Sequence, residues 1–474
     1  MLSYLHKIYY WGELELKYDV VVLGAGPGGY VAAIRSSQLG LKTAILEKEA
    51  VGGLCLNWGC IPSKSLLRNA QVLGLVKNAS EFGITFDNLH YDFGEAIKRS
   101  REVVSKLTNG IDLLLKKNKI DSIKGTGLIE DAHTVKVVET GEVLSTKNII
   151  ISTGATQKQL PGIDIDHNVV MTSRDALETP TVPKRIVIVG GGATGVEFAH
   201  IYNTYGAQVK IVELMPRIIP SEDLDISRNL ERSFKSKGIE IFTDCKVNDI
   251  KADNGIATLS LTKDGVDSIV ECDRVLVSVG MQGNIENIGI ESIGLNVDRG
   301  FILVNDYMKT NISNIYAIGD VTGKMLLAHV ASAQAVVAVE SIAGLNPSVI
   351  DYNNMPRAIY CEPQVASFGI SESDAINNGL NIKVGKFPFS ASGKALALGE
   401  QKGVCKLIMD NDTKELLGAH MIGAEVTELL GEIGILKALE GTVVELGALV
   451  HPHPTISEVI KEASLSIFDE AIHM

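Results

Sequence analysis

The fold class of this chain follows from the stretch Val20-Val21-Val22-Leu23-Gly24-Ala25-Gly26-Pro27-Gly28-Gly29. Four apolar residues lead into a glycine-rich turn, and Gly40, Ala44-Ile45-Leu46 and Glu47 follow it. This order predicts a strand, a tight turn, a helix and a second strand that ends at an acid. Such a unit is the beginning of a nucleotide-binding βαβ fold.

The same pattern occurs a second time in the chain. The run Ile186-Val187-Ile188-Val189 leads into Gly190-Gly191-Gly192-Ala193-Thr194-Gly195, and Gly206, Lys210-Ile211-Val212 and Glu213 follow. The two segments align without a gap at a shift of 166 positions, from Gly24 to Gly190. A single GxGxxG is weak evidence, because glycine turns are common. Two copies in register, each with its acid at the same distance, predict two dinucleotide sites.

Each glycine in such a turn has its own task. The first permits the sharp turn, the second lets the backbone approach a pyrophosphate, and the third lets helix and strand pack closely. The helix N-terminus offers N–H groups and a partial positive charge to the phosphates. The predicted binding glycines are Gly24, Gly26, Gly28 and Gly29 in the first site and Gly190, Gly192 and Gly195 in the second.

The acid that ends each second strand is expected to accept hydrogen bonds from a ribose diol. A carboxylate at Glu213 would repel a 2′-phosphate, so the second site favours NAD over NADP. Arg217 follows only four residues later and leaves some NADP binding open.

Length and composition indicate a multidomain globular protein. The chain has 474 residues with 45% apolar residues, and a protein of this size usually forms two to four domains. Its formal charge of -13 would repel a polyanion, so no nucleic-acid partner is expected. No stretch approaches the roughly 18 uncharged apolar residues of a membrane span. The opening segment looks like neither a secretory nor a mitochondrial signal, and we expect a cytoplasmic protein without membrane contact.

Two of the six cysteines, Cys55 and Cys60, lie close together in the sequence. On a regular helix the axial rise alone would separate them by about 7.5 Å, whereas a disulfide needs Cα atoms within about 6.8 Å. The pair can therefore bond only if the backbone is irregular around Cys55, and neighbouring glycines supply that freedom. A disulfide in so small a loop favours a redox couple. Buried free thiols and half of a zinc site are the alternatives, but no second ligand pair is evident and no metal is expected.

With these residues in view, the sequence resembles the flavoprotein disulfide reductases from about Tyr18 to the C-terminus. The motifs that carry the resemblance are the two glycine turns, Cys55-Leu56-Asn57-Trp58-Gly59-Cys60, Ala317-Ile318-Gly319-Asp320 and His451-Pro452-His453-Pro454-Thr455. The resemblance implies an α/β fold with two Rossmann-like dinucleotide-binding domains, for FAD and NAD, and a C-terminal α+β dimerisation domain.

The resemblance also implies a division into four parts. These are an FAD-binding domain (1–154, with 1–17 as an extra segment), an NAD-binding domain (155–280), a central segment that completes the FAD domain (281–350) and a dimerisation or interface domain (351–474). Two stretches depart from the family pattern, because Met281-Gln282-Gly283 stands where arginine and proline are usual and Thr156-Gln157-Lys158-Gln159 lacks a proline. Both lie in cofactor-domain loops and cast doubt on NAD affinity, not on the chemistry.

Further site residues are implied by the resemblance alone. Glu47 would hold the FAD ribose, and Lys64 would lie beside the flavin with Glu197 as its partner. The remaining cofactor contacts would be Gly154, Asp320, Leu326, Leu327, Ala328 and His329 for FAD, and Gly280 for NAD.

The implied reaction is the oxidation of dihydrolipoamide carried by lipoyl-bearing proteins of 2-oxo acid dehydrogenase or glycine cleavage complexes. A substrate thiolate would attack Cys55 and leave Cys60 as a thiolate against the flavin. His453 would be the base, with Glu458 orienting it, because imidazole titrates near neutral pH. The family implies that His453 and Glu458 serve the other subunit of a homodimer.

Other functions fit the sequence less well. A glutathione reductase would need NADPH-binding arginines where Glu213 stands, and a mercuric reductase would carry a cysteine pair near its C-terminus, which Ser466–Met474 lacks. A transhydrogenase of this fold would lack the Cys55 and Cys60 pair. A non-catalytic flavin subunit that only senses NADH is disfavoured by the presence of both thiols and of His453.

Overall fold

The structure is a computed structural model that describes residues 16–474, so nearly all of the extra segment predicted at 1–17 lies outside the described residues. The chain forms two compact units. The first unit comprises the described residues up to Gly53, with Thr108–Thr156 and Gln282–Ile350. The second unit comprises Leu54–Leu107, Gln157–Met281 and Asp351–Met474.

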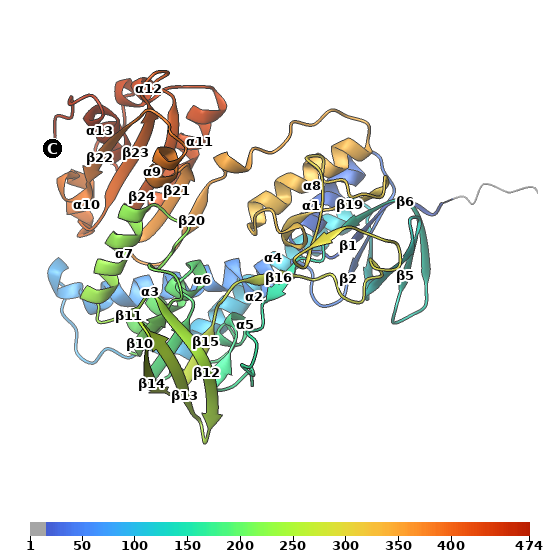
Figure 1. Cartoon of the computed structure of the whole chain (residues 1–474), viewed down its shortest axis with the longest axis horizontal. Coiled ribbons are helices and arrows are strands. Elements are labelled where there is room, and N and C mark those ends of the chain that lie inside the picture. Colours follow the sequence, from blue (N-terminus) through green and yellow to red (C-terminus); the bar gives the residue numbers. More distant parts are fainter. Residues whose placement is uncertain (1–15) are drawn as a thin grey trace, which may run out of the picture. The chain divides into compact units, whose positions relative to one another are not determined.

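The first unit is built on a seven-stranded sheet in the order β3-β2-β1-β6-β5-β4, with β19 also paired to β6. Strand β1 is central and runs parallel to both β2 and β6. Its residues Val20–Leu23 are at most 2% exposed, as expected for a parallel strand that is covered on both faces. Helices α1 and α8 pack against one another (Figure 1).

The elements of the first unit are β1 (Tyr18–Leu23), α1 (Pro27–Gln38), β2 (Thr43–Glu47), β3 (Asp121–Lys124), β4 (Gly127–Asp131), β5 (Thr134–Val137), β6 (Val143–Ile151), β17 (Val297–Asp298), β18 (Phe301–Ile302), β19 (Ile315–Ala317), a 3₁₀ turn at Gly319–Thr322 and α8 (Ala328–Ile342). Four elements contain a point where the chain passes between the units: α2 (Gly53–Trp58), of which only Gly53 belongs to the first unit, α4 (Phe93–Lys117), β7 (Ala155–Gln157) and β16 (Met281–Gly283).

The second unit repeats the sheet arrangement of the first. Its five-stranded sheet has the order β11-β10-β9-β15-β8, so β11-β10-β9-β15 corresponds to β3-β2-β1-β6. Strand β9 is the counterpart of β1 and is parallel to β10 and β15. The predicted internal repeat is therefore also a repeat of strand topology.

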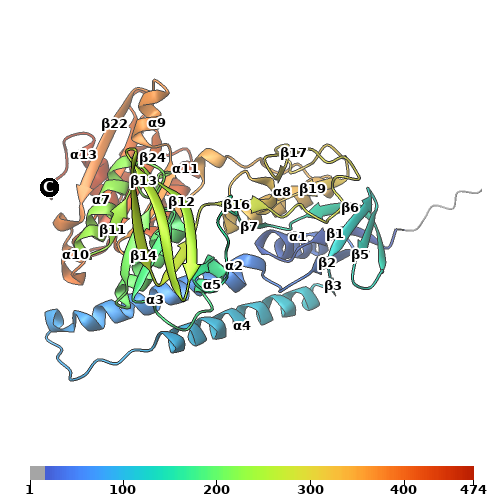
Figure 2. The ribbon, with the colours of Figure 1, turned by 60° about the horizontal axis from the view of Figure 1, so that its bottom comes forward.

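Two further sheets complete the second unit. Strands β12, β13 and β14 form an antiparallel sheet (Figure 2). The C-terminal part forms an antiparallel sheet in the order β20-β21-β24-β23-β22, and residues of α11, α12 and α13 share a buried apolar core with it. Helices α3 and α6 pack together, and Arg99 of α4 donates to Ser65 Oγ of α3 at 2.8 Å.

The elements of this unit are α2 (Gly53–Trp58), α3 (Cys60–Lys77), β8 (Val170–Met171), α5 (Ser173–Ala176), β9 (Arg185–Val189), α6 (Ala193–Thr204), β10 (Gln208–Val212), α7 (Leu224–Ser236), β11 (Glu240–Phe242), β12 (Cys245–Asp253), β13 (Ile256–Lys263), β14 (Val266–Cys272), β15 (Arg274–Val277), β20 (Arg357–Ile359), β21 (Gln364–Gly369), α9 (Glu372–Asn377), β22 (Ile382–Pro388), α10 (Gly393–Leu398), β23 (Val404–Asp410), β24 (Leu416–Gly423), α11 (Leu430–Ala438), α12 (Val443–Ala448) and α13 (Glu458–Ser466).

The predicted fold class is confirmed, with two Rossmann-like parts and a C-terminal α+β part. The finer division at 154, 280 and 350 stays a prediction. By its contacts, the segment Leu54–Leu107 belongs to the second unit, although the sequence assigns it to the FAD-binding domain. Over the described residues 16–474, no helix is long and apolar enough to cross a membrane. The same residues contain no group of three or more His, Cys, Asp or Glu side chains that could hold a metal ion.

Candidate active site

The first glycine turn, between β1 and α1, leaves no room for side chains at two positions. Gly24 has φ +96°, and a Cβ there would lie 2.3 Å from the carbonyl oxygen of Ser152. A Cβ at Gly29 would lie 1.8 Å from the carbonyl oxygen of Gly24. At Gly26 the only neighbour is the Cα of Gly53, at 3.9 Å. The first and last glycines are thus needed for packing, whereas Gly26 borders open space.

The second glycine turn, between β9 and α6, has the same geometry. A Cβ at Gly190 would lie 2.1 Å from the carbonyl oxygen of Ser278, and one at Gly195 would lie 2.0 Å from that of Gly190. Nothing lies within 4 Å of a Cβ at Gly192, which precedes α6 and leaves its first N–H groups without a side-chain cap. An open middle glycine before an uncapped helix suits the approach of a pyrophosphate.

The two acids make equivalent hydrogen bonds. Glu47 accepts from the N–H groups of Ala25 at 2.8 Å and Glu49 at 2.7 Å. Glu213 accepts from those of Gly191 at 2.6 Å and Met215 at 2.8 Å. A carboxylate has about four acceptor positions, so each acid retains capacity for a ribose diol.

Asp320 and the start of α8 lie on the side of the first unit that carries the first glycine turn. A Cβ at Gly28 would lie 3.3 Å from Ile318 Cδ1 and 3.4 Å from the Ala331 carbonyl oxygen. Burial raises the pKa of the Asp320 carboxyl to about 6. No compensating interaction contributes to this shift, so a ligand hydroxyl would be a favourable partner for Asp320.

The other predicted cofactor contacts are partly open. Leu327 precedes α8 and provides no side-chain cap, and Leu326 is 36% exposed. Ala328 and His329 form the first turn of α8. Gly154 and Gly280 have φ +72° and +104°, and nothing lies within 4 Å of a Cβ at either position.

Gly192→Ala tests whether the open middle glycine serves a ligand. The added methyl group meets no protein atom, so thermal stability should stay within about 2 °C of the wild type. The KM for NAD should rise at least about tenfold, because the methyl group would stand between the backbone and the pyrophosphate. Melting curves and steady-state kinetics measure the two effects. An unchanged KM for NAD would contradict the assignment.

Cys55 and Cys60 are free thiols in direct contact, with Cys55 as the hydrogen-bond donor to Cys60. Helix α2 carries Cys55 and ends at Trp58, and Cys60 begins α3. The backbone break is at Gly59 (φ -143°, ψ -112°), whose Cβ would lie 3.3 Å from Cys55 Cα. The backbone is also irregular before Cys55, where Gly52 and Gly53 have φ +95° and +57°. The expected irregularity around Cys55, supplied by glycines, is therefore found on both sides of this residue.

The two thiols differ in acidity. The hydrogen bond from Cys55 lowers the pKa of Cys60 to about 7; burial opposes this shift, and the charge of Lys64 assists it. The same hydrogen bond, together with burial, raises the pKa of Cys55 far above its usual value. A single proton shared by the reduced pair would therefore reside on Cys55, with the thiolate on Cys60.

Lys64 is paired with Glu197, as the resemblance implies. Its Nζ lies 3.0 and 3.1 Å from the two carboxylate oxygens of Glu197, which is buried in α6. Burial lowers the pKa of Lys64, but Glu197 outweighs it and the net shift is upward. Tyr360 was not singled out in the sequence, yet its N–H donates to Glu197 at 2.9 Å and its ring lies 4.8 Å from Lys64 Nζ. No local motif marks Tyr360.

The two histidines of the HPHPT motif have different surroundings. His453 is 78% exposed at its side chain, and its Nδ1 lies 2.9 Å from Glu458 Oε1. The side chain of His451 is only 4% exposed and is paired with Glu432 at 2.8 Å. Glu458 also accepts from the N–H of Thr455 at 2.8 Å. Burial alone would raise the pKa of Glu458, but these hydrogen bonds lower it overall.

The structure brings the predicted residues together in four groups. The first unit holds the first glycine turn, Glu47 and Asp320, and the second unit holds the second glycine turn with Glu213. The second unit also holds the thiol pair with Lys64 and Glu197, and separately the pair of His453 and Glu458. Within the described part of the single chain, no hydrogen bond joins His453 to either cysteine.

Comparison with known families identifies the class of protein. Residues 18–335 match the model described as pyridine nucleotide-disulphide oxidoreductase, and residues 355–464 match the dimerisation domain of the same family. The chain therefore belongs to the pyridine nucleotide-disulphide oxidoreductase family. Its cofactors are FAD and NAD, and the two glycine turns with their open middle positions fit these groups.

The chain is also similar to individual proteins of known name. The chain is 44% identical over 473 residues to a dihydrolipoyl dehydrogenase of Bacillus subtilis, covering 97% of this chain and 100% of that protein. It is 46% identical over 451 residues to a dihydrolipoyl dehydrogenase of Mycobacterium tuberculosis, covering 94% and 97%. Among solved structures, it resembles the HOCl-induced flavoprotein disulfide reductase RclA of Escherichia coli (TM-score 0.85, 27% identity, covering 94% and 99%). It also shares the fold of LpdA of Mycobacterium tuberculosis (TM-score 0.87, 23% identity, covering 94% and 99%).

Proposed function

We propose that this chain acts as a dihydrolipoyl dehydrogenase, which oxidises protein-bound dihydrolipoamide to lipoamide and reduces NAD. The class of enzyme, an NAD-dependent flavoprotein disulfide oxidoreductase, follows from the family. The observation that carries the proposal is the contact between the thiols of Cys55 and Cys60, with Lys64 close enough to act on the pKa of Cys60.

The cofactors supply the redox chemistry, and the protein binds and positions them. When bound, FAD supplies the acceptor for the electron pair of the dithiol, and NAD supplies the final hydride acceptor. The chain provides the glycine turns for the pyrophosphates, and Glu47 and Glu213 for the riboses. Asp320 and the start of α8 would hold the flavin side of FAD. Gly53 approaches Gly26, with a Cβ at Gly53 2.7 Å from the Cα of Gly26, and Cys55 follows only two residues later.

The charge of Lys64 favours Cys60 as the leaving group in thiol exchange. With the pair oxidised, a substrate thiolate attacks Cys55 Sγ, the Cys55–Cys60 bond breaks and Cys60 leaves as a thiolate. A thiol of lower pKa is the better leaving group, and the charge of Lys64 lowers the pKa of Cys60. The second substrate thiolate then displaces Cys55, so the substrate leaves as a disulfide and both cysteines are reduced.

His453 would remove the protons that these attacks require. Its Nδ1 is engaged by Glu458, which leaves Nε2 to receive a proton from a substrate thiol. Glu458 would fix the orientation of the ring and stabilise the imidazolium. The burial of His451 against Glu432 makes it unsuitable for the same task.

The exposure of His453 supports a homodimer in which this residue serves the cysteines of the other subunit. The family's dimerisation domain covers residues 355–464. Large apolar residues on α11, on α12 and in the segments that follow them are exposed in the single chain: Ile435, Leu439, Val444, Leu449 and Val450. Burial of such residues between subunits would stabilise a dimer. The lipoyl substrate would be presented by proteins of 2-oxo acid dehydrogenase or glycine cleavage complexes.

A steady-state assay of the purified holoenzyme tests the function. We expect kcat/KM for the oxidation of dihydrolipoamide with NAD to be at least about 100-fold higher than kcat/KM for the reduction of oxidised glutathione with NADPH. The reason is that a mismatched substrate leaves buried polar groups unpaired. Comparable turnover of oxidised glutathione with NADPH would contradict the proposal. Absence of any turnover with a dithiol would favour a sensor subunit.

A further inference from the structure

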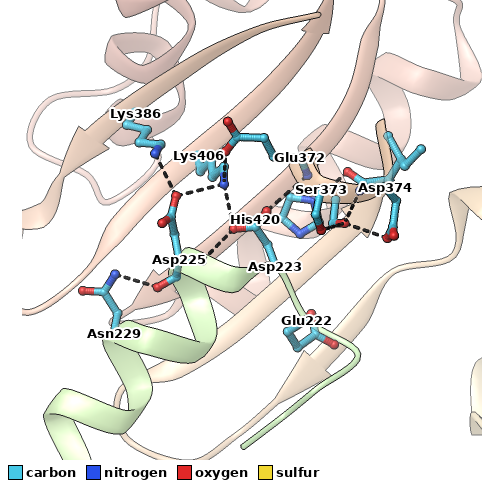
Figure 3. Close-up of polar contacts among 12 residues, drawn as sticks. Glu222, Asp223, Asp225, Asn229, Glu372, Ser373, Asp374, Lys386, Lys406 and His420 are labelled. Carbon is cyan, nitrogen blue, oxygen red and sulfur yellow. Dashed lines mark hydrogen bonds and ion pairs between the residues drawn. The ribbon is translucent and has the colours of Figure 1, made fainter. Parts of the chain in front are cut away.

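Within the second unit, a buried ion cluster joins the start of α7 to the C-terminal sheet (Figure 3). Lys406 of β23 is 2% exposed at its side chain, and its Nζ lies 2.7 Å from Asp223 Oδ1, 2.9 Å from Asp225 Oδ2 and 2.6 Å from Glu372 Oε2. Lys386 of β22, which is half-exposed, adds a contact of 2.7 Å to Asp225. One buried ammonium group thus holds three carboxylates from α7 and α9.

The residue before Asp223 makes a second anchor. Glu222 is 3% exposed, and its carboxylate lies 3.3 Å from Arg357 Nε and accepts a hydrogen bond from the Ser367 hydroxyl. Asp223 also accepts from the N–H of Glu372 at 3.2 Å. Burying charges is costly unless they are paired and hydrogen-bonded. Both acids meet this condition, so their backbone is held firmly against the C-terminal sheet.

The same segment reaches the NAD site at its other end. The N–H of Ile219, three residues before Glu222, donates to the carbonyl oxygen of Gly191 at 2.7 Å. The N–H of Gly191 in turn donates to Glu213 at 2.6 Å. A short piece of chain and two hydrogen bonds therefore connect the ion cluster to the proposed ribose acid.

The connecting segment has a strained backbone. Ile219 is fully buried and has φ +43°, a left-handed conformation that is unfavourable for a β-branched residue. Such a conformation persists only where the surroundings hold it in place. The hydrogen bond to Gly191 holds one end of the segment, and the anchors at Glu222 and Asp223 hold the other.

We propose that Lys406 and Glu222 are positioning residues for NAD. They touch neither cofactor nor substrate; they fix the chain from 219 to 223 and thereby the glycine turn at 191 and the Glu213 carboxylate. If the cluster is weakened, Ile219 is free to relax, the Gly191 turn moves and the site binds NAD less well. This inference uses the NAD site of the proposed function and does not depend on the identity of the dithiol substrate.

Lys406→Met tests the proposal, with Lys386→Met as the matched control. Methionine keeps most of the side-chain volume and removes the charge that Asp223 needs. We expect the dissociation constant for NADH to rise at least about tenfold, measured by calorimetry on the holoenzyme after full reduction so that no hydride transfer accompanies binding. The KM for NAD should rise by a similar factor. The kcat at saturating NAD and the FAD content should stay within about twofold of the wild type. Lys386→Met should leave all four quantities within about twofold.

A second variant covers the case in which Lys406→Met does not fold. Glu222→Gln keeps an acceptor for Ser367 but removes the ion pair with Arg357, and we expect NADH binding to weaken by about three- to fivefold. Unchanged NADH binding in the folded variants would overturn the proposal, and so would a parallel loss of FAD and kcat, which would indicate a purely structural role. Weakened NADH binding in a protein that does not oxidise dihydrolipoamide would support the positioning role and reject the proposed function.

Discussion

Cys55→Ser is expected to abolish dihydrolipoamide oxidation while FAD stays bound. A serine hydroxyl cannot form a disulfide with Cys60, so a substrate thiolate has no sulfur to attack and no mixed disulfide forms. We expect kcat to fall at least about 1,000-fold, the scale of losing a covalent nucleophile. The proposed FAD site consists of the first glycine turn, Glu47 and Asp320, and the substitution changes none of them.

Steady-state turnover and the absorbance of bound flavin measure the two parts of this prediction. Cys245→Ala is a suitable control, because Cys245 is a buried free thiol in β12 and has no proposed part in the reaction. This control should retain turnover within about twofold of the wild type. If Cys55→Ser retained turnover within tenfold of the wild type, the reaction would not require a disulfide between Cys55 and Cys60.

His453→Gln is expected to lower kcat/KM for dihydrolipoamide at least about 100-fold, or about 2.7 kcal/mol of transition-state stabilisation. Glutamine preserves a polar side chain of similar reach and can hydrogen-bond Glu458, but it cannot take a proton from a thiol. The loss should be largest near neutral pH and should shrink as the pH rises, because the substrate then ionises without help.

His473→Gln provides a matched control for this substitution. His473 is also an exposed histidine whose Nδ1 contacts a glutamate, with Glu462 Oε1 at 2.8 Å, but it lies outside the HPHPT motif. Its variant should retain kcat/KM within about twofold across the pH range. A loss of less than tenfold in His453→Gln would place the base elsewhere.

The glycine turns were predictable because their information is local. A Cβ at Gly29 or Gly195 would meet the carbonyl oxygen of the glycine five positions earlier, and Gly24 and Gly190 have positive φ values that favour glycine. The apolar runs before each turn predicted buried parallel strands for the same reason. The recurrence of one pattern 166 positions later then predicted a second site, and the hydrogen bonds of Glu47 and Glu213 follow the same scheme.

The thiol pair was only partly predictable. Spacing showed that a regular helix through both cysteines would keep the sulfurs apart, and this remains correct. It did not show where the helix breaks, because the break at Gly59 arises from the close approach of two helical segments. The acidity of Cys60 also required the positions of Cys55 and Lys64 in space.

Motif residues and periodic patterns thus indicated the two sites, the redox pair and the class of fold before any coordinates were known, because steric limits and burial act over a few neighbouring residues. The environment of Lys64 and the ion cluster around Lys406 depend on packing between distant segments. Tyr360 follows Lys64 by almost 300 positions, and Asp223 and Lys406 are 183 positions apart. Charged residues at such separations look like ordinary surface residues in a sequence. They become buried partners only when the sheets and helices that carry them pack together and exclude water.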